Sequence, residues 1–172
     1  MSILRAILSC VCITCLITGC GRKQANKSVL HREGEPDVVY VGDKDTEMNA
    51  AINQAKKTTD SFLHALASAK SNQTDFAVKR RYATTNNSDF EHIWISQLTY
   101  DGTLLHGKIG DDPVNIPNLK INDAVSCPPA ELTDWMYMED GMIVGGYTIR
   151  VLRKRMSGQE GADFDRRLKF KP

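Results

Sequence analysis

Residues 91–94 combine side chain types that support acid–base chemistry. Glu91 lies next to His92, and Trp94 follows two positions later. An imidazole tuned by a nearby carboxylate is a common general acid or base. On a strand, however, His92 and Trp94 would share one face and Glu91 would lie on the other. The alternative, which we favour, is that His92 is a hydrogen-bonded strand residue and Trp94 a core aromatic.

A second group of candidate residues lies between positions 134 and 150. Arg150 is expected on the last strand among apolar neighbours, where its guanidinium either pairs with Asp134 or Glu91 or binds an anionic group. Of these two roles we favour structural pairing inside the fold. Both groups together form the candidate binding surface, which consists of Glu91, His92, Trp94, Asp134, Trp135, Tyr147 and Arg150.

Sequence motifs of the common enzyme and metal-binding classes are missing. The four histidines occur in no Cys-x-x-Cys or His-x-x-x-His arrangement. There is no Gly-x-Ser-x-Gly, no phosphate-binding loop and no dinucleotide fingerprint. We therefore predict no cofactor, no metal and no catalytic residue from motifs, although an unfamiliar enzyme class stays open.

Length and charge narrow the function classes further. The chain has 172 residues, of which 41% are hydrophobic and 25% charged, as in an ordinary globular domain. With 22 basic and 21 acidic residues, its net charge is +1. A nucleic-acid-binding domain usually has a strongly basic face, so we expect no nucleic-acid partner.

One long helix is predicted after the first forty residues. Apolar residues recur at three- and four-residue spacing over 46–70, while the opposite positions are polar. At 1.5 Å per residue, this helix would be roughly 37 Å long. Its apolar stripe must pack on something, most simply a sheet.

Short strands are predicted in the rest of the chain. Asp101-Gly102 and Asp140-Gly141 are hairpin signals, because the two-residue turn needs positive φ at both positions. Gly145-Gly146 is interpreted as a bulge or bend within the last strand. The predicted strands cover residues 76–82, 90–100, 103–109, 119–127 and 142–152, and residues 130–137 form either a further strand or a short turn leading into one. The expected fold is therefore α+β, with one long amphipathic helix packed on a curved antiparallel sheet of five or six strands.

The first nineteen residues are typical of a secretory signal peptide. A charged start is followed by an apolar run, Ala6 to Thr18, and then by Gly19-Cys20. The end of this run, Leu16-Ile17-Thr18-Gly19-Cys20, resembles the bacterial lipobox. That resemblance implies cleavage after Gly19 and lipidation of Cys20, and hence membrane anchoring through acyl chains.

The lipobox resemblance also sets the expected location and the domain boundaries. Gly21 is not the aspartate of the inner-membrane retention signal, so the outer membrane, facing the periplasm, is the expected destination. The mature chain would keep Cys127 alone, which we interpret as a small buried hydrophobe. We expect a flexible lipidated tether over 20–37, a folded domain over 38–152 and a frayed or loosely docked basic tail over 153–172.

An ordered set of short segments resembles a known family. The segments are Phe76-Ala77-Val78-Lys79, Glu91-His92-Ile93-Trp94, Gly107, Leu119 to Val125, Asp134-Trp135-Met136-Tyr137 and Gly145 to Leu152. Together they resemble the YegJ-like family of bacterial domains of unknown function, also called domain of unknown function 2314. Asn122 stands where the family pattern has glycine, but asparagine tolerates the same left-handed turn. The resemblance implies no established activity, cofactor or catalytic residue.

Three function hypotheses follow. The leading one is a non-catalytic, membrane-anchored binding module that meets a protein partner in the periplasm. The second is an immunity protein or inhibitor that blocks an envelope-directed toxin. The third is a small hydrolase that uses His92 with Glu91 or Asp134.

Overall fold

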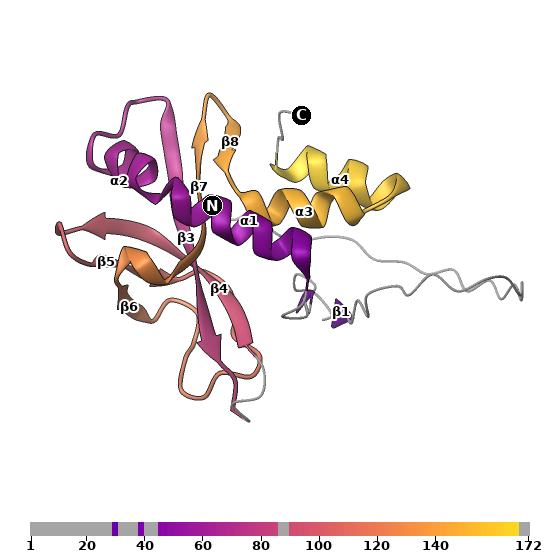
Figure 1. Cartoon of the computed structure of the whole chain (residues 1–172), viewed down its shortest axis with the longest axis horizontal. Helices are drawn as coiled ribbons and strands as arrows, with labels where there is room; N and C mark the ends of the chain where they lie inside the picture. Colours follow the sequence, from indigo (N-terminus) through magenta and orange to yellow (C-terminus); the bar gives the residue numbers. More distant parts are fainter. Residues whose placement is uncertain (1–28, 31–37, 40–44, 86–89, 169–172) are drawn as a thin grey trace, which may run out of the picture. The chain divides into compact units, whose positions relative to one another are not determined.

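The computed structural model describes residues 29–30, 38–39, 45–85 and 90–168 (Figure 1). The chain divides into two compact units, residues 1–45 and 46–172. In the first unit, β1 (Val29–Leu30) pairs antiparallel with β2 (Val38–Val39), so two residues of the predicted tether are strand-paired. The predicted signal peptide, Cys20 and the rest of the tether lie outside the described residues.

The second unit is an α+β domain built on one antiparallel sheet, as predicted. The strand order is β6-β5-β4-β3-β7-β8. The strands are β3 (Gln73–Ala83), β4 (Phe90–Tyr100), β5 (Leu105–Ile109), β6 (Ala124–Cys127), β7 (Leu132–Glu139) and β8 (Met142–Gly145). The helices are α1 (Thr46–Lys57), α2 (Thr59–Ala67), the 3-10 helix η1 (Pro129–Glu131), α3 (Tyr147–Arg155) and α4 (Gly158–Leu168).

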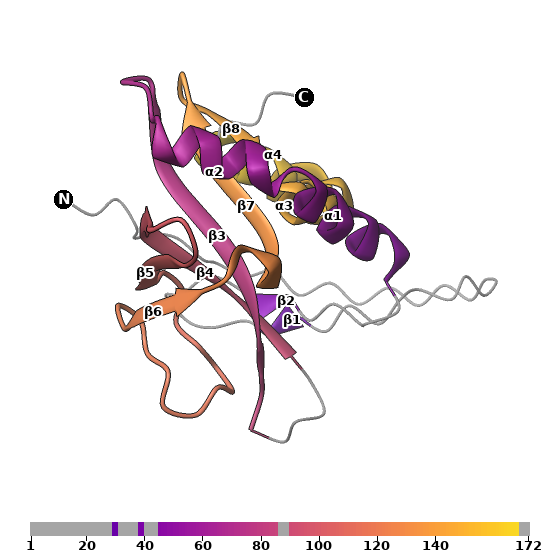
Figure 2. The ribbon, with the colours of Figure 1, turned by 60° about the vertical axis from the view of Figure 1, so that its left-hand side comes forward.

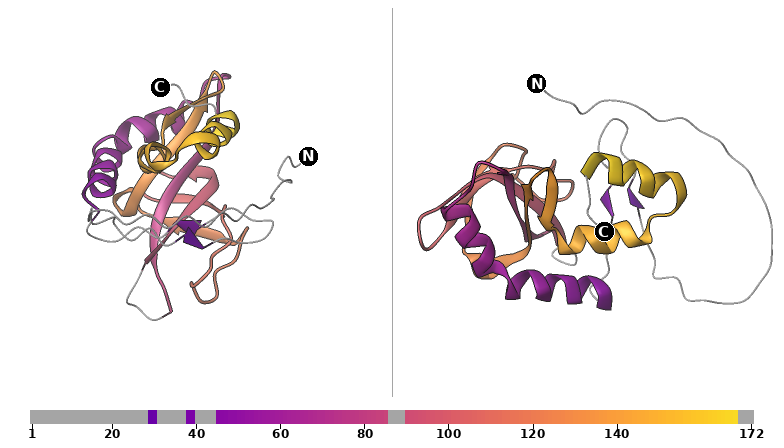
Figure 3. Two further views of the ribbon diagram at one scale, coloured as in Figure 1. Left: turned by 90° about the vertical axis from the view of Figure 1, so that its right-hand side faces the viewer. Right: turned by 90° about the horizontal axis from the view of Figure 1, so that it is seen from above.

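Helices α1 and α2 cover one face of this sheet, which we call the first face (Figures 2 and 3). Phe62 of α2 is fully buried and packs with Val78, Ile93 and Trp135 of the central strands. Strand β4 shows the expected alternation, because Ile93 and Ile95 are buried while His92 between its buried neighbours is exposed. The opposite side of the sheet, which carries His92, is called the second face.

The prediction of one long helix was wrong, because the helix breaks at Thr58. The carbonyl of Ala55 accepts hydrogen bonds from Thr58 N–H (3.2 Å), Thr58 Oγ1 (3.2 Å) and Thr59 Oγ1 (3.1 Å). It also accepts one from the indole N–H of Trp135, at 3.0 Å. Threonine hydroxyls that bond back to the preceding turn compete with the helical ladder and bend helices. Two shorter helices result, and both still bury their apolar sides on the first face.

Both predicted hairpins form, but only one uses the expected turn. Asp140 and Gly141 have φ of 51° and 75°, so the β7–β8 turn has positive φ at both central positions. In the β4–β5 connection only Gly102 has positive φ, at 96°. In this connection the Asp101 carboxylate accepts hydrogen bonds from the backbone N–H groups of Thr103 and Leu104.

The prediction of a last strand running to residue 152 was wrong. Strand β8 ends at Gly145, whose φ is 77°, and Gly146, with φ 63°, precedes helix α3. A Cβ on Gly145 would lie 2.4 Å from the carbonyl oxygen of Trp135, so only glycine fits this exit from the sheet. The chain predicted as a frayed or loosely docked tail is helical over 158–168, where Asp165 forms an ion pair with Arg153 of α3.

Candidate functional site

A buried lysine lies at the centre of the second face. Strand register places Trp94, Lys79 and Asp134 side by side on β4, β3 and β7. The Lys79 ammonium lies 4.6 Å from the centroid of the Trp94 ring and donates to the hydroxyl of Thr148 on α3 at 2.9 Å. Lys79 is 9% exposed and Asp134 is fully buried. Lys79, Asp134 and Thr148 form a buried polar layer of the second face, and the half-buried Trp94 ring lies over Lys79.

The carboxylate of Asp134 holds the start of α3. Its Oδ2 accepts the backbone N–H of Thr148 at 2.8 Å and the hydroxyl of the same residue. Its Oδ1 accepts the backbone N–H groups of Trp135 (2.9 Å) and Tyr147 (3.1 Å). A carboxylate at a helix N-terminus satisfies otherwise unpaired donors and is favoured by the helix dipole. Asp134 is therefore a structural residue that ties β7 to α3.

Burial lowers the pKa of Lys79 below its usual value, and the nearby negative charges of Asp134 and Asp111 oppose that shift. Asp111 belongs to the β5–β6 connection, and its Oδ2 accepts the backbone N–H of Trp94 at 2.9 Å. The lysine is thus held under the tryptophan by groups from β4, β7, α3 and a loop. Lys79 is not among the predicted site residues, because an isolated lysine in a strand gives no signal until the strand register is known.

Above this polar layer the second face presents cations and aromatic rings. The Arg81 guanidinium lies 3.8 Å from the centroid of the Phe90 ring. His92, opposite Arg81 in the sheet, shares a 2.9 Å hydrogen bond between its Nδ1 and Thr133 Oγ1. Trp94 is half-buried, while Lys108 is exposed two strands away from Lys79. We call Arg81, Phe90, His92, Trp94 and Lys108 the cation–aromatic row.

Glu91 does not pair with His92. Its carboxylate turns toward the β5–β6 connection, where it accepts the backbone N–H groups of Val114 (3.0 Å) and Asn115 (3.1 Å). Glu91 is 8% exposed. The two side chains lie on opposite faces of β4, as the alternation predicts, so they do not form the acid–base pair that a hydrolase using His92 with Glu91 needs.

Trp135 and Tyr147 belong to the first-face core rather than to a surface shared with Trp94. Trp135 is 4% exposed, and its ring meets that of Tyr147 edge-on with centroids 5.6 Å apart. The Tyr147 hydroxyl and the Thr58 hydroxyl share a hydrogen bond, with 3.2 Å between the two oxygens, at the break between α1 and α2. These two candidates therefore fix the helices on the sheet.

Arg150 lies on α3 and not on a last strand. Its Nε donates to the carbonyl of Gly145 at 3.1 Å, and its Nη2 donates to the carbonyl of Ile143 at 3.0 Å. Both carbonyls belong to β8, the edge strand of the sheet. Unpaired edge strands promote association, and proteins commonly protect them with charged side chains. Arg150 therefore protects this edge. Pairing with Asp134 or Glu91 was expected, but both of these carboxylates accept backbone N–H groups instead.

Among the described residues, no group of three or more His, Cys, Asp or Glu side chains lies close enough to hold a metal ion. In the same part of the chain, no helix has the length and apolar character needed to cross a membrane.

Comparison with known proteins places the chain in a family. The model of "Uncharacterized protein conserved in bacteria (DUF2314)" matches residues 45–171. The chain belongs to this family. The DUF2314 match covers the second structural unit and extends through α3 and α4, beyond the boundary at residue 152 that the sequence pattern indicated.

Two proteins are similar to this chain over most of its length. The "Uncharacterized protein YegJ" of Escherichia coli (strain K12) is 32% identical over 114 residues, which is 66% of this chain and 72% of YegJ. The "Putative ankyrin repeat protein NMB1133/NMB1171" of Neisseria meningitidis serogroup B is 28% identical over 138 residues, or 77% of this chain. The chain spans 54% of that protein's length. No solved structure matches.

Proposed function

We propose that this DUF2314 protein is a binding module that is lipid-anchored through Cys20 in the bacterial outer membrane, faces the periplasm and binds a protein partner with its second face. The observation that carries the binding role is the cation–aromatic row. The aromatic rings and cations of this row are exposed or half-buried, although the sheet that carries them is itself fully packed. Aromatic side chains lose little entropy on binding, and both aromatic residues and arginine are enriched in interfaces.

The surroundings of the acidic candidates support binding rather than acid–base catalysis at these residues. Glu91 and Asp134 each accept backbone N–H groups, so their carboxylates are committed to a loop and to a helix start. A general base must reach the proton that it abstracts, and neither carboxylate is directed toward His92. The Asp134 and Glu91 versions of the His92 hydrolase hypothesis are therefore the weaker alternatives.

Charge on the second face favours a partner with an acidic surface. Arg81 and Lys108 are exposed cations of the row, and His92 adds a further positive charge when protonated. Complementary potentials speed encounter and fix the register of a complex. We infer a partner that presents carboxylates around an apolar patch able to cover Trp94 and Phe90.

The anchor rests on the first twenty residues. A charged start, an apolar run and Leu16-Ile17-Thr18-Gly19-Cys20 support cleavage and lipidation at Cys20. Metabolic labelling with a fatty acid tests this part. The wild-type chain should be labelled and should appear in the outer-membrane fraction, whereas the Cys20→Ser variant should carry no label. Equal labelling of both chains would overturn the anchor.

The binding role is tested by crosslinking in living cells that carry a tagged, full-length copy. We expect one stoichiometric envelope protein from the wild-type chain and its loss from the Arg81→Glu/Trp94→Ala variant. Lys56→Glu is the matched control, because Lys56 is exposed on α1, away from the second face. Recovery that is equal from all three chains, or absent from the wild type, would contradict a second-face partner.

A further inference from the structure

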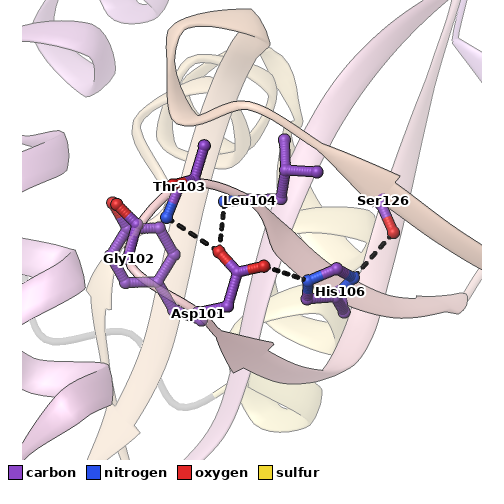
Figure 4. Close-up of polar contacts among 7 residues, drawn as sticks. Asp101, Gly102, Thr103, Leu104, His106 and Ser126 are labelled. Atoms are coloured by element: carbon purple, nitrogen blue, oxygen red, sulfur yellow. Dashed lines mark hydrogen bonds and ion pairs between the residues drawn. The ribbon is translucent and has the colours of Figure 1, made fainter.

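Three side chains at the other end of the second face form a hydrogen-bonded chain (Figure 4). His106 of β5 lies between Ser126 of β6 and Asp101 of the β4–β5 turn. Its Nδ1 is 2.7 Å from Ser126 Oγ, and its Nε2 is 2.8 Å from Asp101 Oδ2. A serine bonded to an imidazole, which is in turn bonded to a carboxylate, is the arrangement that activates a nucleophile.

Backbone hydrogen bonds hold the Asp101 carboxylate of this group in place. Asp101 Oδ1 accepts the backbone N–H groups of Thr103 (2.8 Å) and Leu104 (2.7 Å), which leaves Oδ2 directed at the imidazole (Figure 4). These backbone bonds and the His106 ring lower the pKa of Asp101 to about 2. Asp101 is therefore ionised at neutral pH, and an ionised carboxylate only accepts hydrogen bonds.

That acceptor fixes the tautomer of the histidine. With Asp101 as acceptor, the Nε2 of neutral His106 carries the proton, and the lone pair of its Nδ1 faces Ser126. The Ser126 hydroxyl then donates to Nδ1, which is the geometry for removing its proton. The roles of the two ring nitrogens follow from the carboxylate and need no further group.

Strand register places a backbone donor beside the same serine. Ile109 N–H donates to the Asp123 carbonyl, so alternate residues of β5 bond to β6 and His106 lies between them. His106 and Ser126 are thus a non-hydrogen-bonded pair, the class in which side chains approach most closely. The N–H of Ser126 then faces away from β5 at the edge of the sheet, as β6 is the end strand. A donor in that position can stabilise negative charge on an attacked carbonyl oxygen.

We propose that Ser126 is a catalytic nucleophile that cleaves carboxylic esters, with His106 as general base and Asp101 as its positioning residue. Ser126 Oγ bonds to the ester carbonyl carbon while its proton passes to His106 Nδ1. The carbon–oxygen bond to the alcohol breaks, and that proton leaves with the alcohol. Water, losing a proton to the same nitrogen, then releases the acid and restores the Ser126 hydroxyl, which regains a proton from His106.

Exposure indicates which probe suits the site. The side chains of His106 and Asp101 are 43% and 50% exposed, and Ser126 is exposed on an edge strand. The three side chains are therefore reachable from solvent, so a small water-soluble ester is a suitable probe of the site. This activity goes beyond the proposed binding role and uses different residues, so either can fail without the other.

The test uses the full-length lipidated chain in detergent with two probes, a fluorophosphonate and p-nitrophenyl acetate. We expect the fluorophosphonate to label Ser126 on a mapped peptide, and Ser126→Ala to abolish both labelling and ester cleavage. His106→Ala should slow both at least about 100-fold, the usual worth of a general base. Asp101→Asn should slow both more than about tenfold, because the wrong tautomer then becomes accessible.

Matched controls separate activation from simple exposure. Ser68 is also exposed, but its hydroxyl donates to the backbone carbonyl of His64 and not to a ring. Ser68→Ala should leave labelling and ester cleavage unchanged. If His106→Ala does not fold, His106→Gln with an unchanged melting temperature takes its place. Equal labelling of Ser68 and Ser126, or rates that do not depend on residue 106, would overturn the proposal.

Discussion

Lys79 donates a 2.9 Å hydrogen bond to the hydroxyl of Thr148, and this bond joins the central strand β3 to the first turn of α3. The same hydroxyl donates to the buried carboxylate of Asp134. The Thr148 hydroxyl therefore bridges the Lys79 ammonium and the Asp134 carboxylate, which strand register places side by side. Buried polar groups are costly unless every member is hydrogen-bonded, so this layer defines a single packing of α3 on the sheet.

Removing the mediating hydroxyl should weaken the fold. In Thr148→Val the shape is kept, while Lys79 and Asp134 each lose a buried partner. We expect the free energy of unfolding to fall by about 1–3 kcal/mol, the cost of an unsatisfied buried polar group. Urea denaturation measures it. Thr74→Val is the control, because that hydroxyl contacts an exposed aspartate, and it should change stability by less than about 0.5 kcal/mol.

The buried lysine should give stability a characteristic pH dependence. Since the folded-state pKa of Lys79 lies below 10.5, the folded chain binds fewer protons than the unfolded chain between the two values. The free energy of unfolding contributed by Lys79 therefore rises with pH through that window. The difference between wild type and Lys79→Met, followed by urea denaturation, should rise accordingly. A stability difference that does not change with pH would contradict the burial of this amine.

Asp101 should make the stability of the fold depend on pH in the acidic range. Its pKa is lowered from 3.8 to about 2, so its stabilising effect is complete above pH 3.8 and is lost as pH falls through about 2. Wild type should unfold at a higher temperature than Asp101→Asn near neutral pH, and the gap should close between pH 3.8 and 2. Melting curves across this range check it, and a gap that persists below pH 2 would show another cause.

Gly145 and Gly102 form a matched pair of glycine positions. Both have positive φ, of 77° and 96°, but a Cβ on Gly145 meets the Trp135 carbonyl oxygen at 2.4 Å, whereas Gly102 has open space. We expect Gly102→Ala to cost about 1–2 kcal/mol from backbone strain alone. Gly145→Ala should cost more than about 3 kcal/mol, because backbone atoms must also move. Equal costs in urea denaturation would argue against this exit of the chain from the sheet.

Local patterns predicted the strands of this fold better than its helices. Period-two alternation and Asp-Gly turns identify β4 and its hairpins because both are properties of neighbouring residues. The break at Thr58 depends partly on the indole of Trp135, about eighty positions away, so helical periodicity does not reveal it. Gly145-Gly146 is equally compatible with a bulge and with a strand-to-helix exit, and only the Asp134 carboxylate at the start of α3 decides between them.

Some features of the candidate site can be predicted from a single strand, whereas others depend on how the strands pair. Alternation correctly separates Glu91 from His92, since it needs only the strand itself. The burial of Lys79 and the meeting of His106 with Ser126 require the pairing of strands, which no spacing in the sequence encodes. Long-range register therefore produces both polar clusters of the second face.

Photo-crosslinking in living cells from single positions of the full-length chain tests binding by the second face most directly. A photoreactive amino acid replaces His92 on the second face or, as a control, Lys56 on α1; both residues are exposed. We predict one defined envelope protein crosslinked from position 92, none from position 56, and loss of the product when Arg81→Glu is added. Crosslinks from position 56 alone, or no crosslink from either position, would contradict a binding role for the second face.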